Sequence, residues 1–358
     1  MIISSQIVDS KVTLTIESPS QQWLARARAR LDQLTKPLGS LGRLEDLAAQ
    51  MVSIREETFA DPMRKAVYVF AADHGITAEG VSAYPSEVTR QMVLNFLAHG
   101  AAVNVLAKLH QAEVNVVDVG VDADFGRVDG LLHHKVRMGT RNMMREPAMS
   151  VDELTAALDV GLRLADDAKT KGYNLVAVGE MGIGNTTAAS AITFALTREP
   201  VNRITGKGTG LNSEALTHKC LVIEAVLAKH FDNLPAEPLD VLRCVGGLEI
   251  AAMTGFILGA ARHRLAVVVD GFISTAAAAI AFAIAPQVCG YLFGGHQSEE
   301  PGHRVLLEYI GLKPILALNM RLGEGTGAVL AMPILESALS LYNQMATFES
   351  AGVSEAKD

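Results

Sequence analysis

Aromatic residues are scarce in this sequence, and cysteines are few and scattered. Phe, Trp and Tyr make up 5% of the 358 residues, whereas Gly alone occurs 31 times. Small residues in this proportion suit the close packing of helices on sheets in an α/β protein. The three cysteines, Cys220, Cys244 and Cys289, form no C-x-x-C pair. This argues against a disulfide scaffold or a cysteine-based zinc site and favours a reducing cytoplasm.

Clustered positive charge and long apolar runs are also missing. The formal net charge is −8, and no stripe of Lys and Arg with interleaved aromatics is present, which argues against nucleic acid as a partner. The longest apolar run, TAAAAIAFAIA (275–285), is too short to span a membrane. The first residues, MIISSQIVDSKVTL, lack the charged start and continuous apolar run of a signal peptide. We therefore expect a soluble, cytoplasmic protein without a membrane span.

The spacing of apolar residues predicts helices near the start of the chain and then a parallel sheet. Residues 20–58 have apolar residues at helical spacing, and the one Pro and two Gly in 36–42 divide them into two helices. Six short apolar runs follow, each with a polar or Gly-rich end: KAVYVFAADHG, EVNVVDVGVDAD, YNLVAVGEMGIGNTT, LAVVVDGFIST, CGYLFGGHQSE and KPILALNMRLGEG. Because these runs are continuous rather than alternating, they indicate strands buried on both faces, and hence a mostly parallel α/β sheet.

Acidic residues and histidines stand at the ends of the predicted strands. In an open α/β sheet, ligands bind beyond the carboxyl ends of the strands. The residues expected there are Asp73, His74, Asp118, Glu180, Asp270, His296 and Glu324. A site with so many carboxylates is suited to handle a cation or a proton.

Two glycine-rich stretches are candidates for binding a phosphate. GEMGIGNTTAAS (179–190) is a turn entering a helix, with Asn185 or one of the two following threonines as the helix cap, and its free backbone N–H groups would attract an anion. The stretch matches neither the P-loop nor the G-x-G-x-x-G pattern, so an ordinary capped turn is an equal alternative. TGKGTGLN (205–212) is followed by Lys219, which would either meet a phosphate or lie in solvent.

Glu324 lies between two glycines in RLGEGTG (321–327) and is the main candidate for a catalytic base. The flanking stretches PILALNM and AVLAMPILESAL indicate buried surroundings. A carboxylate in such surroundings has a raised pKa and can accept a proton near neutral pH. The alternative is a glutamate solvated at a loop tip, and Glu180 is the rival for the role of base.

Eight short motifs occur between about residue 20 and about residue 345. In order they are KPLGSLGRLE (36–45), ADHGITAEGVSAYPSEVT (72–89), GVDAD (120–124), GTRN with PAMS (139–150), GEMGIGNTT (179–187), VGGLEIAAMTGFILGAA (245–261), VVVDGFIST (267–275) and MRLGEGTGAVLAMPILE (320–336). Each motif is weak alone, but eight in one order are hard to obtain by chance. Together they resemble the nicotinate-nucleotide:dimethylbenzimidazole phosphoribosyltransferase family, which makes the lower-ligand nucleotide of cobalamin.

The resemblance implies a reaction and a set of site residues. Phosphoribose would pass from nicotinate mononucleotide to 5,6-dimethylbenzimidazole, giving α-ribazole 5′-phosphate and nicotinate with inversion at ribose C1. The catalytic residues implied are Glu324 as the general base and Glu180 near the ribose or supporting the base. The implied nucleotide-binding residues are Gly182, Gly184, Asn185, Thr186, Gly208, Lys219 and Ser298. The implied base-binding residues are Ser82, Tyr84, Gln91, Met92 and Leu322.

The resemblance also implies the architecture and the partners. The expected fold is a doubly wound, Rossmann-like parallel sheet with a smaller helical domain built from both chain ends. Residues 1–60 and 333–358 would form the small domain and residues 61–332 the large catalytic domain. The family generally forms homodimers, so a homodimer is expected. No metal and no cofactor are expected, because the donor carries one phosphate and no pyrophosphate.

Three other hypotheses remain open at this point. The chain could act on another azole or purine base, since some relatives have Ser at the position of Tyr84 and Gln at that of Met92, and one methyl group changes selectivity by only about 1–3 kcal/mol. It could bind a nucleotide or base without catalysis. It could be a metallohydrolase built on Asp73 and His74, although no H-x-x-x-H pattern and no second histidine cluster accompany them. A Ser/His/Asp hydrolase is equally weakly indicated, because the sequence has no G-x-S-x-G elbow.

Overall fold

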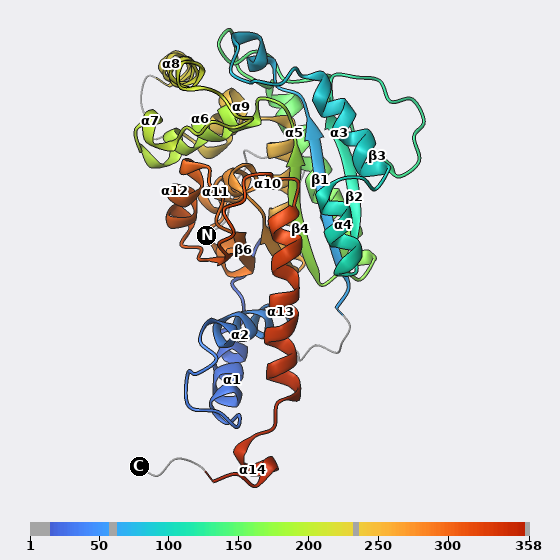
Figure 1. The fold of residues 1–358 in the computed structure, drawn as a ribbon, viewed down its shortest axis with the longest axis vertical. Helices are drawn as coiled ribbons and strands as arrows, with labels where there is room; N and C mark the ends of the chain where they lie inside the picture. The colour runs from blue at the N-terminus through green and yellow to red at the C-terminus, as the bar shows by residue number, and fades with distance from the viewer. Residues whose placement is uncertain (1–14, 57–62, 232–235, 355–358) are drawn as a thin grey trace.

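The computed structural model describes residues 15–56, 63–231 and 236–354, and its centre is one parallel sheet (Figure 1). The seven strands are in the order β3-β2-β1-β4-β5-β6-β7, and every neighbouring pair is parallel. The strands are β1 (Lys65–Ala72), β2 (Ala112–Gly120), β3 (Leu131–His133), β4 (Leu175–Met181), β5 (Ala266–Val269), β6 (Leu292–His296) and β7 (Pro314–Leu316). The predicted α/β, Rossmann-like class is confirmed. The sheet is wholly rather than mostly parallel.

The central strands are buried along their whole length, as their continuous apolar runs predict. All residues of β1 and β4 are buried. The short edge strand β3 is not among the six predicted, because its three residues form no apolar run of their own. The register pairs Ala71 of β1 with Asp118 of β2 and with Met181 of β4. The carboxyl ends of these strands therefore lie side by side.

Helices cover both faces of the sheet. They are α1 (Gln21–Asp32), α2 (Arg43–Arg55), α3 (Glu87–Leu97), α4 (Ala102–Leu109), α5 (Val151–Thr170), α6 (Asn185–Thr197), α7 (Val201–Ile204), α8 (Ser213–His230), α9 (Pro238–Val245), α10 (Leu248–Arg262), α11 (Phe272–Ile284), α12 (Pro301–Ile310), α13 (Thr326–Gln344) and α14 (Phe348–Ala351), with short 3-10 helices η1 (Gly75–Glu79) and η2 (Pro286–Tyr291). Helices α4 and α13 lie on one face, and α10, backed by α5, lies on the other (Figure 1).

Small residues allow α5 and α10 to pack very closely. A Cβ atom on Gly161 would lie 1.9 Å from the carbonyl oxygen of Ala252, and one on Gly255 would lie 2.0 Å from that of Leu158. No residue with a side chain fits at such distances. The scarcity of aromatics and the abundance of glycine thus reflect helices whose backbones nearly touch.

Helices α1 and α2, from the beginning of the described chain, and α13, from near its end, meet below the sheet (Figure 1). Helices α1 and α2 pack against the far half of α13, and Arg30 donates to the carbonyl oxygens of Tyr342 (2.8 Å) and Asn343 (3.2 Å). The predicted pair of helices on either side of 36–42 is confirmed. The division into two domains stays a prediction, and its boundary at Pro333 falls inside α13.

Within the described residues, one segment is long and apolar enough to cross a membrane by length and composition, Glu87–Leu109. In the structure it is divided into α3 and α4 by His99, which has a positive φ of 58°, and by Gly100. The apolar run at 275–285 lies almost entirely in α11, whose residues 272–281 are all buried. The expectation about a signal peptide concerns residues 1–14, which lie outside the described part of the chain.

Candidate active site

The loop that carries Glu324 lies directly against the end of strand β4. A Cβ atom on Gly323 would lie 2.4 Å from Glu180 Oε1, and one on Gly179 would lie 2.3 Å from the backbone nitrogen of Gly325. Gly323, Glu324 and Gly325 have consecutive positive φ angles of 80°, 66° and 84°. The two glycines adopt this left-handed turn without strain, whereas Glu324 does so at a cost of about 1–3 kcal/mol. The glycines therefore bring the two glutamates together.

Asp270, which follows β5, holds this loop in place. Its Oδ2 accepts from the backbone N–H of Gly325 at 3.0 Å, and its Oδ1 accepts from that of Ala328 at 2.9 Å. A carboxylate is favourable here because the first turn of α13 leaves N–H groups without helical partners. His296 Nε2 lies 3.7 Å from Asp270 Oδ1. Burial raises the pKa of Asp270, and the nearby His296 and these N–H donors oppose the rise.

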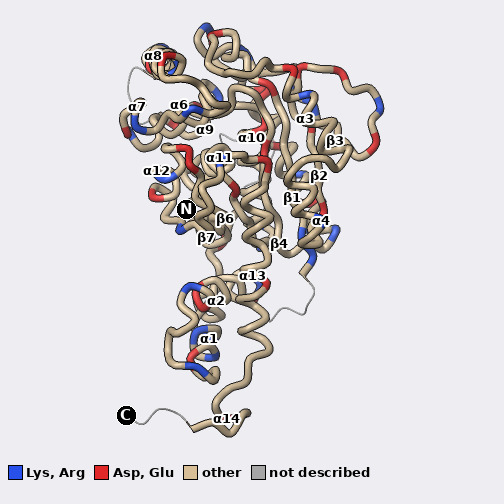
Figure 2. The backbone as a smooth tube through the Cα atoms, viewed as in Figure 1, with Lys and Arg blue, Asp and Glu red and all other residues tan. Residues whose placement is uncertain are grey.

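Both glutamates are buried and have raised pKa values. Glu324 is 6% exposed, and burial followed by the charge of Asp270 raises its pKa to about 7. Burial raises the pKa of Glu180 to about 8, with further contributions from Glu249 and Asp270, against a hydrogen bond from the Asn185 amide. The prediction of buried surroundings for Glu324 is confirmed, and the solvated loop tip is wrong. Figure 2 shows acidic residues gathered above β4 and α10.

Glu249 belongs to the same cluster but was not singled out from the sequence. It is fully buried in the first turn of α10, and its Oε1 lies 2.7 Å from His74 Nε2. Its other oxygen has no hydrogen-bond partner within the described part of the chain. Its position after Gly246 and Gly247, at the start of a buried helix, is the sequence signal that could have identified it.

The other residues expected at the strand ends or as metal ligands have partners within the protein. His74 is bonded to Glu249, and Asp73 Oδ2 accepts from the backbone N–H of Asp122 at 2.8 Å. In the residues that the structure describes, no group of three or more His, Cys, Asp or Glu residues is arranged to hold a metal ion. Asp118 pairs with Lys135, with 2.8 Å between Oδ2 and Nζ, so its charge is balanced outside the glutamate cluster.

Lys219 and both glycine-rich loops meet at a second centre. Lys219 is completely buried and donates to Thr186 Oγ1 at 2.8 Å, so a lysine in solvent is wrong here. A Cβ atom on Gly208 would lie 2.8 Å from Thr186 Oγ1 and 3.3 Å from Lys219 Nζ. Burial lowers the pKa of Lys219 to about 8, and the charge of Glu300 opposes this. A buried cation beside a glycine backbone and a hydroxyl forms a centre suited to an anion.

Glu300 and Ser298 lie beside this lysine. Glu300 is 6% exposed and its Oε1 accepts from the Gly208 N–H at 3.0 Å. Ser298 Oγ accepts from the Glu300 N–H at 3.3 Å, and the Ser298 N–H donates to His303 Nδ1 at 2.9 Å. Neither Glu300 nor His303 was predicted, because each also contacts a residue from another part of the chain: Glu300 accepts from the Gly208 N–H, and His303 Nε2 lies 2.9 Å from Thr275 Oγ1.

The helix cap predicted for the first glycine loop is wrong. Gly184, at a φ of 97°, is the N-cap of α6, and no side chain caps that helix. The side chains of Asn185 and Thr186 instead form hydrogen bonds with Glu180 and Lys219 respectively. Gly182 lies against β1, since a Cβ atom there would be 2.4 Å from the Ala72 carbonyl oxygen. The loop therefore links the glutamate cluster to the lysine.

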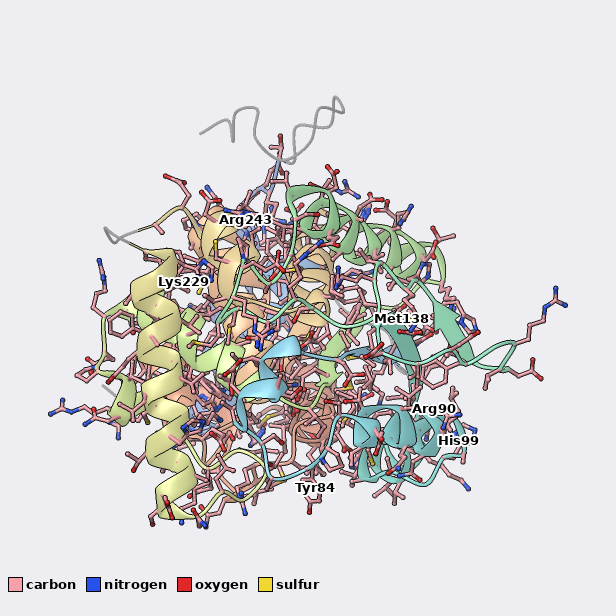
Figure 3. All side chains as sticks on the ribbon, turned by 90° about the horizontal axis from the view of Figure 1, so that it is seen from above. Tyr84, Arg90, His99, Met138, Lys229 and Arg243 are labelled. Atoms are coloured by element: carbon pink, nitrogen blue, oxygen red, sulfur yellow. The ribbon has the colours of Figure 1, made fainter. Side chains whose placement is uncertain are left out.

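The residues expected to hold the acceptor base are exposed or half-buried. Tyr84 and Leu322 are each 55% exposed, Gln91 is exposed and Met92 is half-buried. Ser82 Oγ donates to the Tyr84 carbonyl oxygen at 3.0 Å. Figure 3, seen from above, shows Tyr84 at the edge of the molecule, on the segment that leads into α3.

Comparison with known proteins agrees over nearly the whole chain. A family model described as phosphoribosyltransferase matches residues 16–353. The chain belongs to this family. The nicotinate-nucleotide–dimethylbenzimidazole phosphoribosyltransferase of Geobacter sulfurreducens is 56% identical over 332 residues, which cover 93% of this chain and 94% of that protein. The protein of the same name from Chloroflexus aggregans is 52% identical over 332 residues, with the same two coverages.

A solved structure of a relative gives the same fold. The crystal structure of nicotinate-nucleotide–dimethylbenzimidazole phosphoribosyltransferase from Thermus thermophilus is 46% identical in sequence and has a TM-score of 0.88, over 94% of this chain and 100% of that one. The present chain is therefore a phosphoribosyltransferase and an enzyme. The hypotheses of a non-catalytic binding protein and of a metallohydrolase are wrong.

Proposed function

We propose that this phosphoribosyltransferase transfers phosphoribose from nicotinate mononucleotide to 5,6-dimethylbenzimidazole, giving nicotinate and α-ribazole 5′-phosphate for the nucleotide loop of cobalamin. One observation carries the proposal. The buried glutamates Glu180 and Glu324 lie at one end of the GEMGIGNTT loop, and the buried Lys219 lies at its other end. The substrates named for relatives at 52–56% identity have matching chemistry, an anion to bind and a proton to remove.

Lys219, Thr186 and Gly208 are proposed to bind the 5′-phosphate. The ammonium group and the Thr186 hydroxyl already face each other at 2.8 Å. Charge-assisted hydrogen bonds to phosphate are roughly twice as strong as neutral ones, and burial strengthens them further. Fixing the phosphate there would extend the ribose towards Glu180 along the same loop.

The transfer itself balances without a general acid. The bond between ribose C1 and the pyridine nitrogen breaks, and its electron pair leaves with nicotinate, whose ring becomes neutral. An imidazole nitrogen of the acceptor attacks C1 from the opposite face, which inverts the configuration. The positive charge that develops on the ribose lies near the buried carboxylates, which favours the transition state. The proton on the acceptor's other nitrogen passes to a carboxylate.

Glu324 is proposed as that base and Glu180 as its supporting residue. Burial raises the pKa values of both carboxyl groups, to about 7 and about 8, so each is able to exchange a proton near neutral pH. The Asn185 amide already donates to Glu180, whereas Glu324 lies in the turn between two glycines. Asp270 fixes the Glu324 backbone, so the base is held in position before the substrates bind.

Ser82, Tyr84, Gln91, Met92 and Leu322 are proposed to hold the acceptor base. Their exposure suits residues that gain a partner only when the base is bound. We further propose a cytoplasmic homodimer that uses no metal and no cofactor, with the division into small and large domains given above. The preferred base among azoles and purines depends on these five side chains.

The function is tested by incubating the enzyme with nicotinate mononucleotide and 5,6-dimethylbenzimidazole and resolving the products by chromatography. Equal amounts of nicotinate and a ribosylated benzimidazole phosphate are expected. Proton NMR of the sugar should give the α configuration at C1. A parallel panel of benzimidazole, adenine and imidazole would rank the acceptors. No nicotinate release with any base would contradict the proposed function, and a β product would contradict inversion.

A further inference from the structure

The loop at 205–212, between α7 and α8, contacts both proposed substrate-binding regions. Its Gly208 lies against Lys219 and Thr186 on the phosphate side, and the Gly208 N–H donates to Glu300. The next residue, Thr209, faces the opposite way, towards the segment that carries Tyr84. Two neighbouring residues thus contact two different parts of the site.

Thr209 makes two hydrogen bonds to the acceptor segment. The Ala83 N–H donates to Thr209 Oγ1 at 3.0 Å, and the Thr209 and Ser82 hydroxyls lie 3.3 Å apart. Ser82 also donates to the Tyr84 carbonyl oxygen and accepts from the Tyr84 N–H. Because one hydroxyl has a single proton, the arrangement that satisfies every contact has Thr209 donating to Ser82. Thr209 therefore accepts from one residue of the segment and donates to the one before it.

Two adjacent residues of α8 likewise contact two different parts of the site. Lys219 Nζ contacts Thr186 at 2.8 Å, whereas His218 Nε2 lies 2.7 Å from the Glu79 carbonyl oxygen, at the end of η1. The chain between η1 and Tyr84 is thus held by the loop and by α8. In Figure 3, α8, labelled at Lys229, runs to the same edge of the molecule as Tyr84.

The loop also contacts the segment that carries the proposed base. Arg321 Nη1 donates to the Gly208 carbonyl oxygen at 3.1 Å, so Gly208 is bonded through its N–H to Glu300 and through its carbonyl to Arg321. A phosphate bound at Lys219 would therefore restrict a loop whose other contacts lie on the acceptor segment and beside Glu324.

We propose that Thr209 is a positioning residue, through which an occupied phosphate site arranges residues 82–84 for the acceptor base. This rests on the proposed function, because it assigns the phosphate and the base to the two sides of the loop. The two ligands then bind cooperatively, and by thermodynamic reciprocity each strengthens the binding of the other by the same factor. Two partly exposed hydrogen bonds support a coupling of roughly fivefold to twentyfold.

The experiment measures the dissociation constant of 5,6-dimethylbenzimidazole by titration in saturating ribose 5-phosphate and, separately, in ribose. Neither sugar carries the nicotinate leaving group, so no transfer takes place. For the wild-type enzyme the base should bind about five to twenty times more tightly with ribose 5-phosphate. Thr209→Val, which keeps the side-chain shape but removes the hydroxyl, should bring this ratio close to one.

Two variants separate positioning from a merely structural effect. Thr209→Ser keeps the hydroxyl and should keep the wild-type ratio. Thr217→Val removes an exposed hydroxyl that bonds Ser213 within α8, and it should also keep the ratio. A ratio near one for the wild type, or an undiminished ratio in Thr209→Val, would overturn the proposal.

The same proteins are assayed for product formation with nicotinate mononucleotide and the base. Coupled binding without any product would leave the positioning role intact and refute the proposed function instead. Product formed by a wild type that shows no coupling would do the reverse.

Discussion

Burial shifts pKa values in opposite directions at the two ends of the site, the glutamate end and the lysine end. At one end Glu180 and Glu324 lie near Glu249 and Asp270, and burial raises the pKa of the first two to about 8 and about 7. At the other end Lys219 lies beside Glu300, and burial lowers its pKa to about 8. The physical cause is the same, because a buried site disfavours any charged form. At both ends burial therefore favours the neutral form more than water does.

The comparison teaches how the site fits a substrate with opposite charges at its ends. The proposed donor has an anionic phosphate and a cationic pyridinium. A phosphate bound at Lys219 favours the ammonium form of that residue, and a cationic ribose near Glu324 favours its carboxylate form. Each end is therefore expected to favour its charged form more strongly in the complex than in the free enzyme. The predictions below remove or titrate one end at a time.

The largest effect is expected from Glu324→Gln, which keeps the shape of the side chain but removes the base. Turnover should fall about 10²–10⁴-fold, the usual contribution of a positioned general base. Affinity for nicotinate mononucleotide should stay close to that of the wild type, because the phosphate end is untouched. Steady-state kinetics and nucleotide titration measure the two quantities.

Glu299→Gln is the matched control for that substitution, since Glu299 is exposed and lies outside the cluster. It should leave turnover unchanged. Full activity of Glu324→Gln would remove the proposed base, and attention would pass to Glu180.

Removing the opposite end should weaken binding rather than chemistry. Lys219→Met deletes a charged hydrogen-bond donor, and the KM for nicotinate mononucleotide should rise roughly 10–100-fold. The affinity for nicotinate riboside, which lacks the phosphate, should hardly change. Lys207→Met, at an exposed position of the neighbouring loop at 205–212, is the control. An equal loss for nucleotide and riboside would show that Lys219 does not bind the phosphate.

Titration should reveal both ends in one profile. Below pH 7, kcat/KM should fall about tenfold per pH unit as Glu324 is protonated, because its pKa is about 7. Above pH 8 it should decline again as Lys219 loses its proton, because that pKa is about 8. Lys219→Met should abolish the alkaline limb and keep the acidic one. A wild-type profile that is flat from about pH 5 to about pH 9 would contradict both assignments.

The smallest effect concerns stability at the acidic end. The folded-state pKa of Glu180 is about 8, above its usual value of 4.5, so the folded protein binds more protons than the unfolded chain between these pH values. The free energy of unfolding should then decrease as pH rises through this window. Glu180→Gln should raise Tm by a few degrees at about pH 8.5 and by much less at about pH 5. Calorimetry at the two pH values tests this, and an equal shift at both would exclude the titration of Glu180 as its cause.

The fold was accessible from the sequence where a signal is local. The central strands are marked by continuous apolar runs, and the pair of helices at the start by apolar spacing and a turn. The strand β3 has only the three residues Leu131–His133 and no such run. Glu324 could be singled out because a charged residue between glycines and apolar stretches is locally unusual.

The parts of the site that could not be predicted depend on partners from elsewhere in the chain. The sequence left open whether Lys219 meets a phosphate or lies in solvent, and only the contacts with Thr186 and with the loop at 205–212 show that it is buried. Asn185 has the residue type of a helix cap, but its amide group donates to Glu180 instead. Asp270 bonds backbone groups 55 and 58 residues later in the chain, which no local pattern reveals.

That last separation has a consequence for synthesis. When the ribosome has made Asp270, the N–H groups of Gly325 and Ala328 do not yet exist. At about 5–20 residues per second, roughly 3–12 s pass before both exist. During this interval Asp270 lacks two of the hydrogen-bond donors that it has in the complete fold. The turn that carries Glu324 can therefore be fixed by Asp270 only after the first turn of α13 has been made.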